Sequence, residues 1–293
     1  MVRVDETLYP FESHYHQVDG GRLHYIDEGE GTPVVMVHGN PSWSFYYRNV
    51  VSALKDRYRC IVPDHIGCGF SDKPSADAYG YSLQNRIDDL SSLLDETVPG
   101  QQVDLIVHDW GGAIGCGWAG RHPERVRRLV VLNTGAFRNP NGQKIPPSLK
   151  LIRNTPLGRL LVQGFNAFSA GATRMAVTRP MPKAVRAAYT APYSTWADRI
   201  ATLRFVQDIP LGPDDPAWHP LIETESNLER LKAHPMLICW GEKDFVFTAD
   251  FLAEWQRRFP DASVTTYPNG GHYILEDEAE DVVTRIERFL DAS

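Results

Sequence analysis

The stretch that decides the fold is VDLIVHDWGG at residues 103–112, an apolar run that ends in an acid, an indole and two glycines. An apolar run rich in β-branched residues predicts a buried strand. Gly111 and Gly112, followed by the small residues AIGC at 113–116, predict a helix that begins directly after the strand and packs close to it. The stretch therefore predicts a strand, a sharp turn and a helix, with Asp109 on the turn.

Asp109 occupies the position that a nucleophile takes in a strand–turn–helix elbow. In the G-x-S-x-G elbow, the nucleophile lies on a strained turn at the carboxyl end of a strand, and the next backbone N–H points into the site. This chain has an aspartate where that elbow has serine. A lone aspartate there is also typical of a loop acid or a helix N-cap. The nucleophile assignment therefore depends on partners elsewhere in the chain.

Composition excludes several classes of protein. The chain has 293 residues, 42% of them hydrophobic, which is enough for one large α/β domain or two small ones with a sizeable core. A net charge of −7, with no Lys/Arg cluster interleaved with aromatic residues, argues against a nucleic-acid partner. No signal peptide and no apolar run of about 18 residues is present, so we expect no membrane span.

The cysteines indicate the redox environment. Four cysteines stand far apart, without a C-x-x-C motif, at Cys60, Cys68, Cys116 and Cys239. This spacing suggests neither a zinc site nor a disulfide framework. We therefore expect a protein of the reducing cytoplasm.

Strand patterns and helix patterns alternate along most of the chain. A hairpin is predicted around Gly20 and Gly21, within residues 12–30. The further strands are predicted at 33–37, 59–64, 126–132, 235–241 and 263–267, and the helices at 44–56, 83–98 and 278–291. Alternation of this kind predicts an α/β fold with a mostly parallel, doubly wound sheet. Catalytic groups in such sheets gather at the carboxyl ends of the strands.

The strand rhythm is interrupted once. Between residues 136 and 215 the pattern shows helical pieces broken by prolines, and strands then resume. We therefore expect a helical lid over 136–215, inserted into a core made of residues 1–135 and 216–293. Apolar lid residues could line a substrate cavity, among them Leu160, Leu161, Phe165, Phe168, Met175 and Phe205.

Two further candidates follow predicted strand ends. Asp244 closes the sequence GEKD at 241–244, and His272 closes GGH at 270–272. Asp109, Asp244 and His272 thus appear in the order nucleophile, acid, histidine that α/β-hydrolases have along the chain. A carboxylate is already ionised at neutral pH, so it can displace a leaving group from an sp³ carbon and form an alkyl ester. His272 would then activate a water against the ester, oriented by Asp244.

Asn40 and Trp110 are the predicted anion donors. The backbone N–H groups of both residues would stabilise the oxyanion that forms on Asp109. Their side chains offer amide and indole N–H groups, which suit a departing anion in an apolar cavity. A turn asparagine and a packing tryptophan are the alternatives.

The motifs together resemble those of haloalkane dehalogenases of the α/β-hydrolase superfamily, over nearly the whole chain outside the lid. They are HGNP at 38–41, DHIG at 64–67, VHDWGG at 107–112, WGEKD at 240–244 and GH at 271–272. Asn40 combined with an acid at Asp244 resembles the third dehalogenase subfamily, because the strand before the lid ends in Asn133 and Thr134 without a carboxylate. That subfamily includes proteins similar to β-lactone decarboxylases of long-chain olefin biosynthesis.

The resemblance implies a haloalkane dehalogenase, which cleaves carbon–halogen bonds through a covalent aspartyl-alkyl ester to give alcohol and halide. Decarboxylation of cis-β-lactones to olefins by the same residues is the alternative. Epoxide hydrolysis, with Tyr189 and Tyr193 as lid donors, is a less favoured one. A binding protein without turnover fits poorly, because none of the catalytic groups is missing.

The resemblance also implies the ligands. We expect a small apolar organic substrate, a halide ion, no cofactor and no metal. Self-association, or membership of an enzyme assembly, is implied by the resemblance alone.

Overall fold

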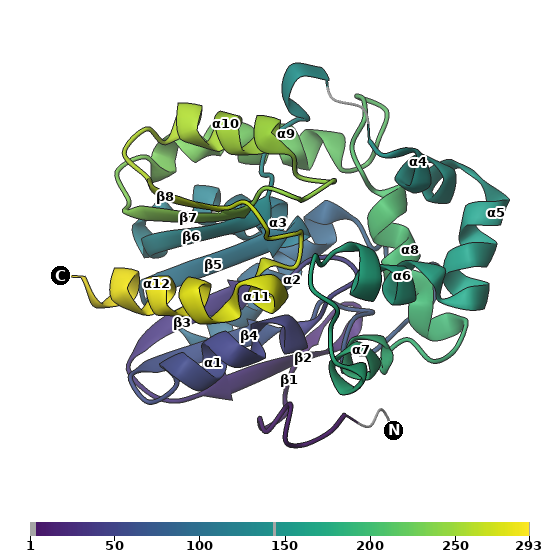
Figure 1. Cartoon of the computed structure of the whole chain (residues 1–293), viewed down its shortest axis with the longest axis horizontal. Helices are drawn as coiled ribbons and strands as arrows, with labels where there is room; N and C mark the ends of the chain where they lie inside the picture. Colours follow the sequence, from purple (N-terminus) through teal and green to yellow (C-terminus); the bar gives the residue numbers. More distant parts are fainter. Residues whose placement is uncertain (1–3, 143–144, 293) are drawn as a thin grey trace.

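A single sheet organises residues 4–142 and 145–292, the part of the chain that the computed structural model describes (Figure 1). Its strands are β1 (His14–Val18), β2 (Gly21–Glu28), β3 (Thr32–Val37), β4 (Tyr58–Pro63), β5 (Val103–Asp109), β6 (Val126–Thr134), β7 (Met236–Gly241) and β8 (Ser263–Tyr267). The order across the sheet is β1-β2-β4-β3-β5-β6-β7-β8. β1, β2 and β4 pair antiparallel, and the pairings from β4 through β3 to β8 are parallel. The expected α/β fold is confirmed.

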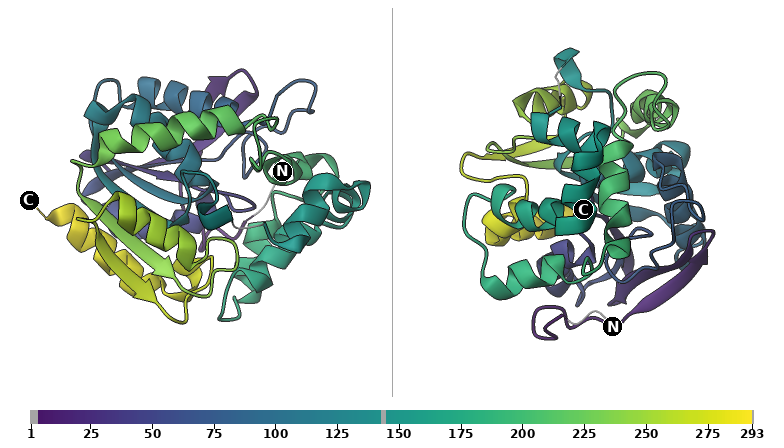
Figure 2. Two further views of the ribbon diagram at one scale, coloured as in Figure 1. Left: turned by 90° about the horizontal axis from the view of Figure 1, so that it is seen from above. Right: turned by 90° about the vertical axis from the view of Figure 1, so that its right-hand side faces the viewer.

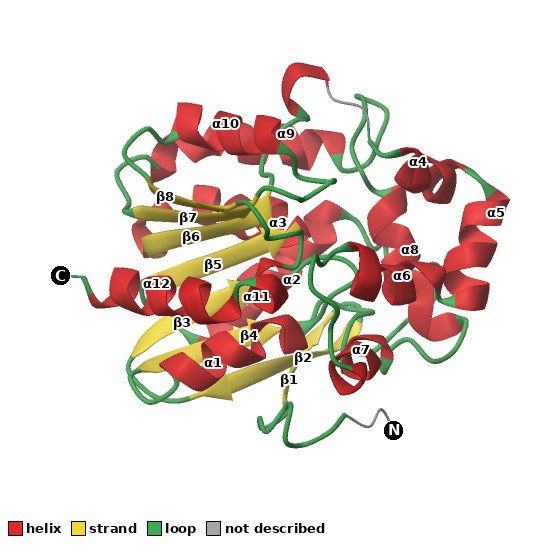
Figure 3. Cartoon of the chain, in the orientation of Figure 1, coloured by secondary structure: helices red, strands yellow, loops and turns green. Residues whose placement is uncertain are grey.

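Alternate residues of the central strands face two separate cores. Figure 3 shows helices on both faces of the sheet. In β3, Val35 and Val37 pack into one core, whereas Val34 and Met36 pack into the other. The first core is covered by α2 (Leu83–Thr97), α3 (Trp110–Arg121), α9 (Trp218–Asn227) and α10 (Ala249–Arg258). The second is covered by α1 (Arg48–Leu54), α11 (Ile274–Asp277) and α12 (Ala279–Asp291). Burial on both faces explains why these strands read as continuous apolar runs.

The helix predicted at 44–56 differs from the structure. Its first turn is a 3₁₀ turn at Ser44–Tyr47, and the α-helix begins only at Arg48. The Ser44 N–H donates to Oδ1 of the buried Asp64 at 2.7 Å, a contact from a distant loop that the local pattern does not encode.

The lid helices lie between β6 and β7 in the chain. They are α4 (Pro147–Asn154), α5 (Pro156–Arg159), a π-helix at Leu160–Gly164, α6 (Ala167–Met175), α7 (Lys183–Thr190) and α8 (Ile200–Gln207). Figures 1 and 2 show them beyond the carboxyl ends of the parallel strands, the edge where Asp109 is found. Residues 143–144 of the expected lid lie outside the described residues, and its limits stay a prediction.

Within the described ranges, no helix combines the length and the apolar character needed to span a bilayer.

Gly111 permits the close approach of α3 to β3, and we expect its replacement to be costly. A Cβ at this position would lie 1.9 Å from the carbonyl oxygen of Val37. The backbone of β3 or α3 would therefore have to move. We expect Gly111→Ala to lower the free energy of unfolding, measured by urea titration, by about 4 kcal/mol or more. Gly171→Ala in α6 is the matched control, because its Cβ would meet no atom within 4 Å. It should instead gain up to about 1 kcal/mol of helix propensity. Equal effects of the two substitutions would contradict this account.

Candidate active site

Asp109 is held in a strained turn between β5 and α3. Its φ of 54° and ψ of −126° lie in a region that non-glycine residues seldom adopt. Strain of this kind costs about 1–3 kcal/mol and persists where the surroundings enforce it. Here the Thr134 hydroxyl donates to the Asp109 carbonyl oxygen, and the absence of a side chain at Gly39 leaves room for the carboxylate. The turn directs that carboxylate into a cavity.

Donors surround the Asp109 carboxylate. The Asn40 N–H donates to Oδ1 at 2.5 Å, and the Trp110 backbone N–H also bonds the carboxylate. His272 Nε2 lies 3.5 Å from Oδ2. Burial raises the pKa of Asp109, while the imidazole and the two N–H groups oppose that rise. The backbone groups predicted to form an oxyanion site are thus both at the predicted nucleophile.

His272 bridges the two predicted acids. Its Nδ1 lies 2.7 Å from Asp244 Oδ2, which leaves Nε2 facing Asp109. Burial disfavours the imidazolium, yet the Asp244 and Asp109 carboxylates outweigh burial and raise the pKa of His272. His108 supports this loop from below, since its Nε2 lies 2.8 Å from the His272 carbonyl oxygen and its ring stacks on Tyr46 at 4.3 Å.

Asn133 contacts the candidate acid Asp244, which the sequence does not predict. Its Nδ2 donates to Asp244 Oδ2 at 3.0 Å, and its Oδ1 accepts from the Gly241 N–H at 2.8 Å. The backbone N–H groups of Val246 and Phe247 donate to the other Asp244 oxygen at 2.7 and 3.0 Å. The sequence showed only that no carboxylate ends β6. Asn133 and Asp244 are 111 positions apart in the sequence, so no local pattern indicates this contact.

Helix α8 contacts both predicted anion donors. Asn40 Nδ2 donates to the Thr202 carbonyl oxygen at 3.1 Å, and Asn40 Oδ1 is buried without a partner among the described residues. The Trp110 indole packs on Phe205 with ring centres 5.5 Å apart. On Phe205 lies the buried guanidinium of Arg86, 3.6 Å from the ring centre. Helix α8 of the lid therefore fixes the orientation of the Asn40 and Trp110 side chains. The buried guanidinium of Arg86 lies next to Phe205.

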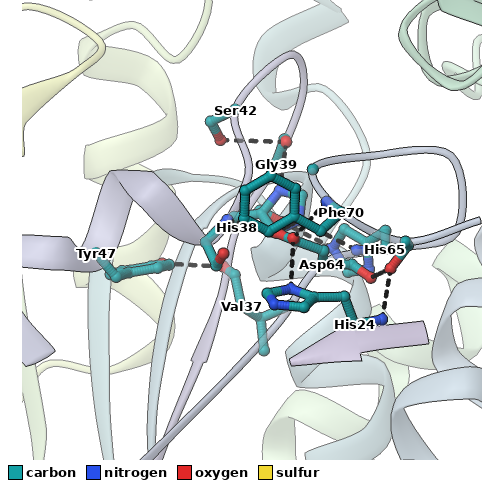
Figure 4. A network of polar contacts seen from close by, with 12 residues as sticks. His24, Val37, His38, Gly39, Ser42, Tyr47, Asp64, His65 and Phe70 are labelled. Carbon is teal, nitrogen blue, oxygen red and sulfur yellow. Dashed lines mark hydrogen bonds and ion pairs between the residues drawn. The ribbon is translucent and has the colours of Figure 1, made fainter. Parts of the chain in front are cut away.

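A buried polar network supports the loop that carries Asn40 (Figure 4). Asp64 accepts from His24 Nδ1 at 2.8 Å and from the N–H groups of Ser44 and Phe70 at 2.7 and 2.9 Å. Burial opposes ionisation of Asp64, but the hydrogen bond from His24 and the backbone N–H donors outweigh burial and hold the pKa of Asp64 well below the usual range.

His38 joins this network to the Gly39–Asn40 loop. The His65 N–H donates to His38 Nε2 at 3.2 Å, so His38 Nδ1 carries the hydrogen that bonds the Gly39 carbonyl oxygen at 2.8 Å. His65 Nε2 in turn lies 2.9 Å from the His38 carbonyl oxygen. Burial lowers the pKa of both imidazoles. Two neutral histidines thus hold the loop in place.

The cavity above Asp109 measures ≈310 Å³, within the range of small-molecule sites. Asn40, Asp109, Trp110 and His272 lie on its wall, which is otherwise mostly apolar. Among the lid residues named from the sequence, Leu161, Phe168 and Met175 line the cavity. The expectation was wrong for Leu160 and Phe165, which are exposed beyond the wall, and for Phe205, which is buried behind Trp110. Periodicity does not tell which face of a lid helix turns inward.

The two lid tyrosines lie outside the cavity wall. The Tyr189 hydroxyl donates to Glu276 Oε1 at 2.5 Å, and the Tyr193 hydroxyl donates to the Ser42 carbonyl oxygen at 3.4 Å. Both side chains are buried in these contacts.

No cluster of three or more His, Cys, Asp or Glu side chains among the described residues is arranged to hold a metal ion.

Known proteins resemble this chain in sequence and in structure. The sequence profile described as "alpha/beta hydrolase fold" matches residues 32–279. A cis-3-alkyl-4-alkyloxetan-2-one decarboxylase of Shewanella oneidensis is 55% identical over 286 residues, 97% of this chain and 90% of the relative. One of Xanthomonas campestris pv. campestris is 48% identical, over 93% of each chain. The crystal structure of a haloalkane dehalogenase from Bradyrhizobium elkani USDA94 superposes with a TM-score of 0.85 at 27% identity, over 97% of this chain and 100% of that chain.

The buried histidines predict a loss of stability in acid. The folded pKa of His65 lies well below its ordinary value of 6.5, so below pH 6.5 the unfolded chain binds a proton that the folded chain does not. The contribution of the neutral, buried His65 to the free energy of unfolding is complete above pH 6.5 and decreases as the pH falls below 6.5. His65→Gln should therefore reduce the slope of unfolding free energy against pH, below pH 6.5, by up to about 1.4 kcal/mol per pH unit. Urea titrations from pH 8 to 5 measure both slopes, and identical slopes would contradict a neutral buried His65.

Proposed function

The chain belongs to the alpha/beta hydrolase fold family, and on this premise we propose that it is a β-lactone decarboxylase with Asp109 as nucleophile. Its substrates would be cis-3-alkyl-4-alkyloxetan-2-ones, and its products an olefin and carbon dioxide. The observation that carries the proposal is the 55% identity to such a decarboxylase over 97% of the chain, because that span includes the lid and hence the cavity wall. It favours the second of the two reactions expected from the sequence.

The first step opens the lactone ring. Asp109 Oδ2 attacks ring atom C4 opposite the ring oxygen, since Oδ1 is occupied by the Asn40 N–H. The C4–O bond breaks, and its electron pair stays on the oxygen, which becomes part of a carboxylate on C3. The product is an alkyl ester of Asp109. The side-chain N–H groups of Asn40 and Trp110 would bind the new carboxylate.

The second step forms the olefin. The bond between the carboxylate carbon and C3 breaks, its electron pair becomes the C3=C4 double bond, and the C4–O bond to Asp109 breaks in turn. Carbon dioxide leaves, and Asp109 regains its carboxylate. No water is consumed and no proton is transferred overall. Inversion at C4 followed by anti elimination converts a cis-lactone into a cis-olefin.

His272 has a different task in this reaction than in hydrolysis. Its imidazolium, favoured by the Asp244 carboxylate, lies 3.5 Å from Oδ2 and would stabilise the Asp109 carboxylate as it leaves. In a hydrolysis it must instead be neutral to deprotonate water.

Haloalkane hydrolysis is the second candidate, supported by the superposition on a haloalkane dehalogenase at 27% identity. Asp109 would displace a halide into the same donors, and water activated by His272 would attack the ester carbonyl beside the Asn40 and Trp110 N–H groups. Epoxide hydrolysis lacks support, because Tyr189 and Tyr193 bond residues outside the cavity wall.

Product analysis tests the proposal. The purified protein receives a cis-3,4-dialkyl β-lactone in one sample and 1-bromobutane in another, and proton NMR follows both. We expect a cis-olefin from the lactone and little alcohol from the bromide. Fast alcohol formation with intact lactone would instead identify a haloalkane dehalogenase.

A substitution pair accompanies that experiment. Asp109→Ala should lose at least about 10³-fold in turnover, since it removes the nucleophile. Asp261→Ala, which removes an exposed acid, is the matched control and should leave turnover unchanged.

Heavy-oxygen labelling of Asp109 distinguishes hydrolysis of the aspartyl ester from decarboxylation. Hydrolysis adds a water oxygen to the carboxyl group of Asp109 in each turnover, whereas the proposed decarboxylation adds none. After many lactone turnovers in H₂¹⁸O, mass spectrometry of the peptide that contains Asp109 should therefore find no label. One or two heavy oxygens in that peptide would mean that water attacks the ester, and the proposed second step would be wrong.

A further inference from the structure

The lid has a charge opposite to that of the rest of the chain. Residues 125–197 contain no Asp or Glu, although the chain has 37 of them. Over 136–215 there are eleven Lys and Arg residues and four Asp residues, a net charge of +7. Because the whole chain carries −7, the remainder carries −14. The molecule is therefore basic at the lid and acidic elsewhere.

Part of the lid charge is exposed and unpaired. Arg138, Arg153 and Arg179 form ion pairs with carboxylates outside the acid-free stretch. In contrast, Lys150, Arg159 and Arg174 are exposed, and none of them forms an ion pair within the described part of the chain. Because none of these three exposed cations is paired with a carboxylate in the described part of the chain, their charge faces solvent.

Large apolar side chains are exposed on the same segment. Seven of the nine large apolar side chains that are exposed among the described residues belong to the lid. Phe165 is 71% exposed, Met175 64% and Leu157 53%. The others in the lid are Leu151, Leu160, Trp196 and Leu211. Their number sets the lid apart, since single exposed apolar residues are common on any protein.

Cations and apolar side chains are neighbours there. The Arg159 guanidinium lies 5.7 Å from the centre of the Trp196 ring. A Cβ on Gly164 would lie 3.0 Å from Leu160 and 3.5 Å from Trp196. We call the exposed side of residues 150–175, together with Trp196, the lid face; Figure 2, right, views the molecule from the lid side.

The cavity meets solvent near this face. Leu151 and Met175 line the cavity and are also exposed, by 38% and 64%. Phe245, 41% exposed, joins them from the loop after β7. The cavity therefore has an apolar rim that is continuous with the lid face.

We propose that the lid face docks on an anionic lipid surface. Exposed Trp, Phe and Leu side chains interleaved with Lys and Arg are the pattern of proteins that lie on membranes, and the acidic remainder of the chain orients the lid toward the negative surface. Docking brings the cavity rim to the lipid, so that an apolar substrate enters without crossing water. The substrate's route rests on the proposed function, whereas docking is measured without substrate.

Vesicle co-sedimentation tests docking with the full-length protein. Vesicles of phosphatidylglycerol should bind it at low salt, vesicles of phosphatidylcholine should not, and salt should weaken the binding. The triple variant Lys150→Gln, Arg159→Gln, Arg174→Gln should bind on the order of 10²-fold more weakly. Phe165→Ser should weaken binding as well, with the charge unchanged.

The matched control removes three positive charges from exposed residues outside the lid. Arg22→Gln, Lys232→Gln and Arg257→Gln together replace three exposed cations outside the lid and should leave vesicle binding as strong as in the wild type. Equal loss in both triple variants would overturn the proposal. So would equal binding to the two lipids, or salt-sensitive self-association without vesicle binding, which would mean that the lid pairs with the acidic core of a second copy.

Lactone turnover in detergent micelles separates the two proposals. If the lid triple variant keeps olefin formation in micelles but fails on vesicles, docking is supported and the reaction stands. If the wild type binds vesicles but forms no olefin, the proposed function fails while docking stands.

Discussion

The candidate active site depends on one constraint, which is that a carboxylate must be accommodated inside a mostly apolar cavity. An unpaired buried carboxylate would take up a proton or destabilise the fold, because burial disfavours its charged form. Asp109 avoids this through the Asn40 and Trp110 N–H groups and the imidazole of His272. These contacts compensate the charge only in part, since the pKa of Asp109 remains raised. A partly compensated carboxylate is a better nucleophile than a fully paired one.

The supporting contacts reach Asp109 from three directions. Asn133 and two backbone N–H groups orient Asp244, which orients His272. The neutral imidazoles of His38 and His65, beside Asp64, hold the loop that presents the Asn40 N–H. Helix α8 then orients the Asn40 side chain and the Trp110 ring from above. Because α8 belongs to the lid, lid and core together hold the two candidate anion donors in place.

The lid and the core divide the work between them. The core supplies the candidate catalytic residues at the carboxyl ends of its strands, and the lid supplies much of the apolar cavity wall. The lid is also the basic part of an otherwise acidic chain, which the net charge of −7 conceals. The net charge of a whole chain indicates which partners it can bind only when the charge is evenly distributed, and here it is not.

The sequence by itself determined the strands, the parallel sheet and the candidate residues Asp109, Asp244 and His272, because strand periodicity and strand-end motifs are local properties. Their catalytic roles stay predictions. Tertiary structure alone decided that Asn133 holds Asp244, that α8 touches the anion donors, and that Leu160 and Phe165 face outward. These outcomes depend on which surfaces meet when segments far apart in the chain pack together. A local pattern carries no information on such meetings, because the same helix or strand end can be packed against many partners.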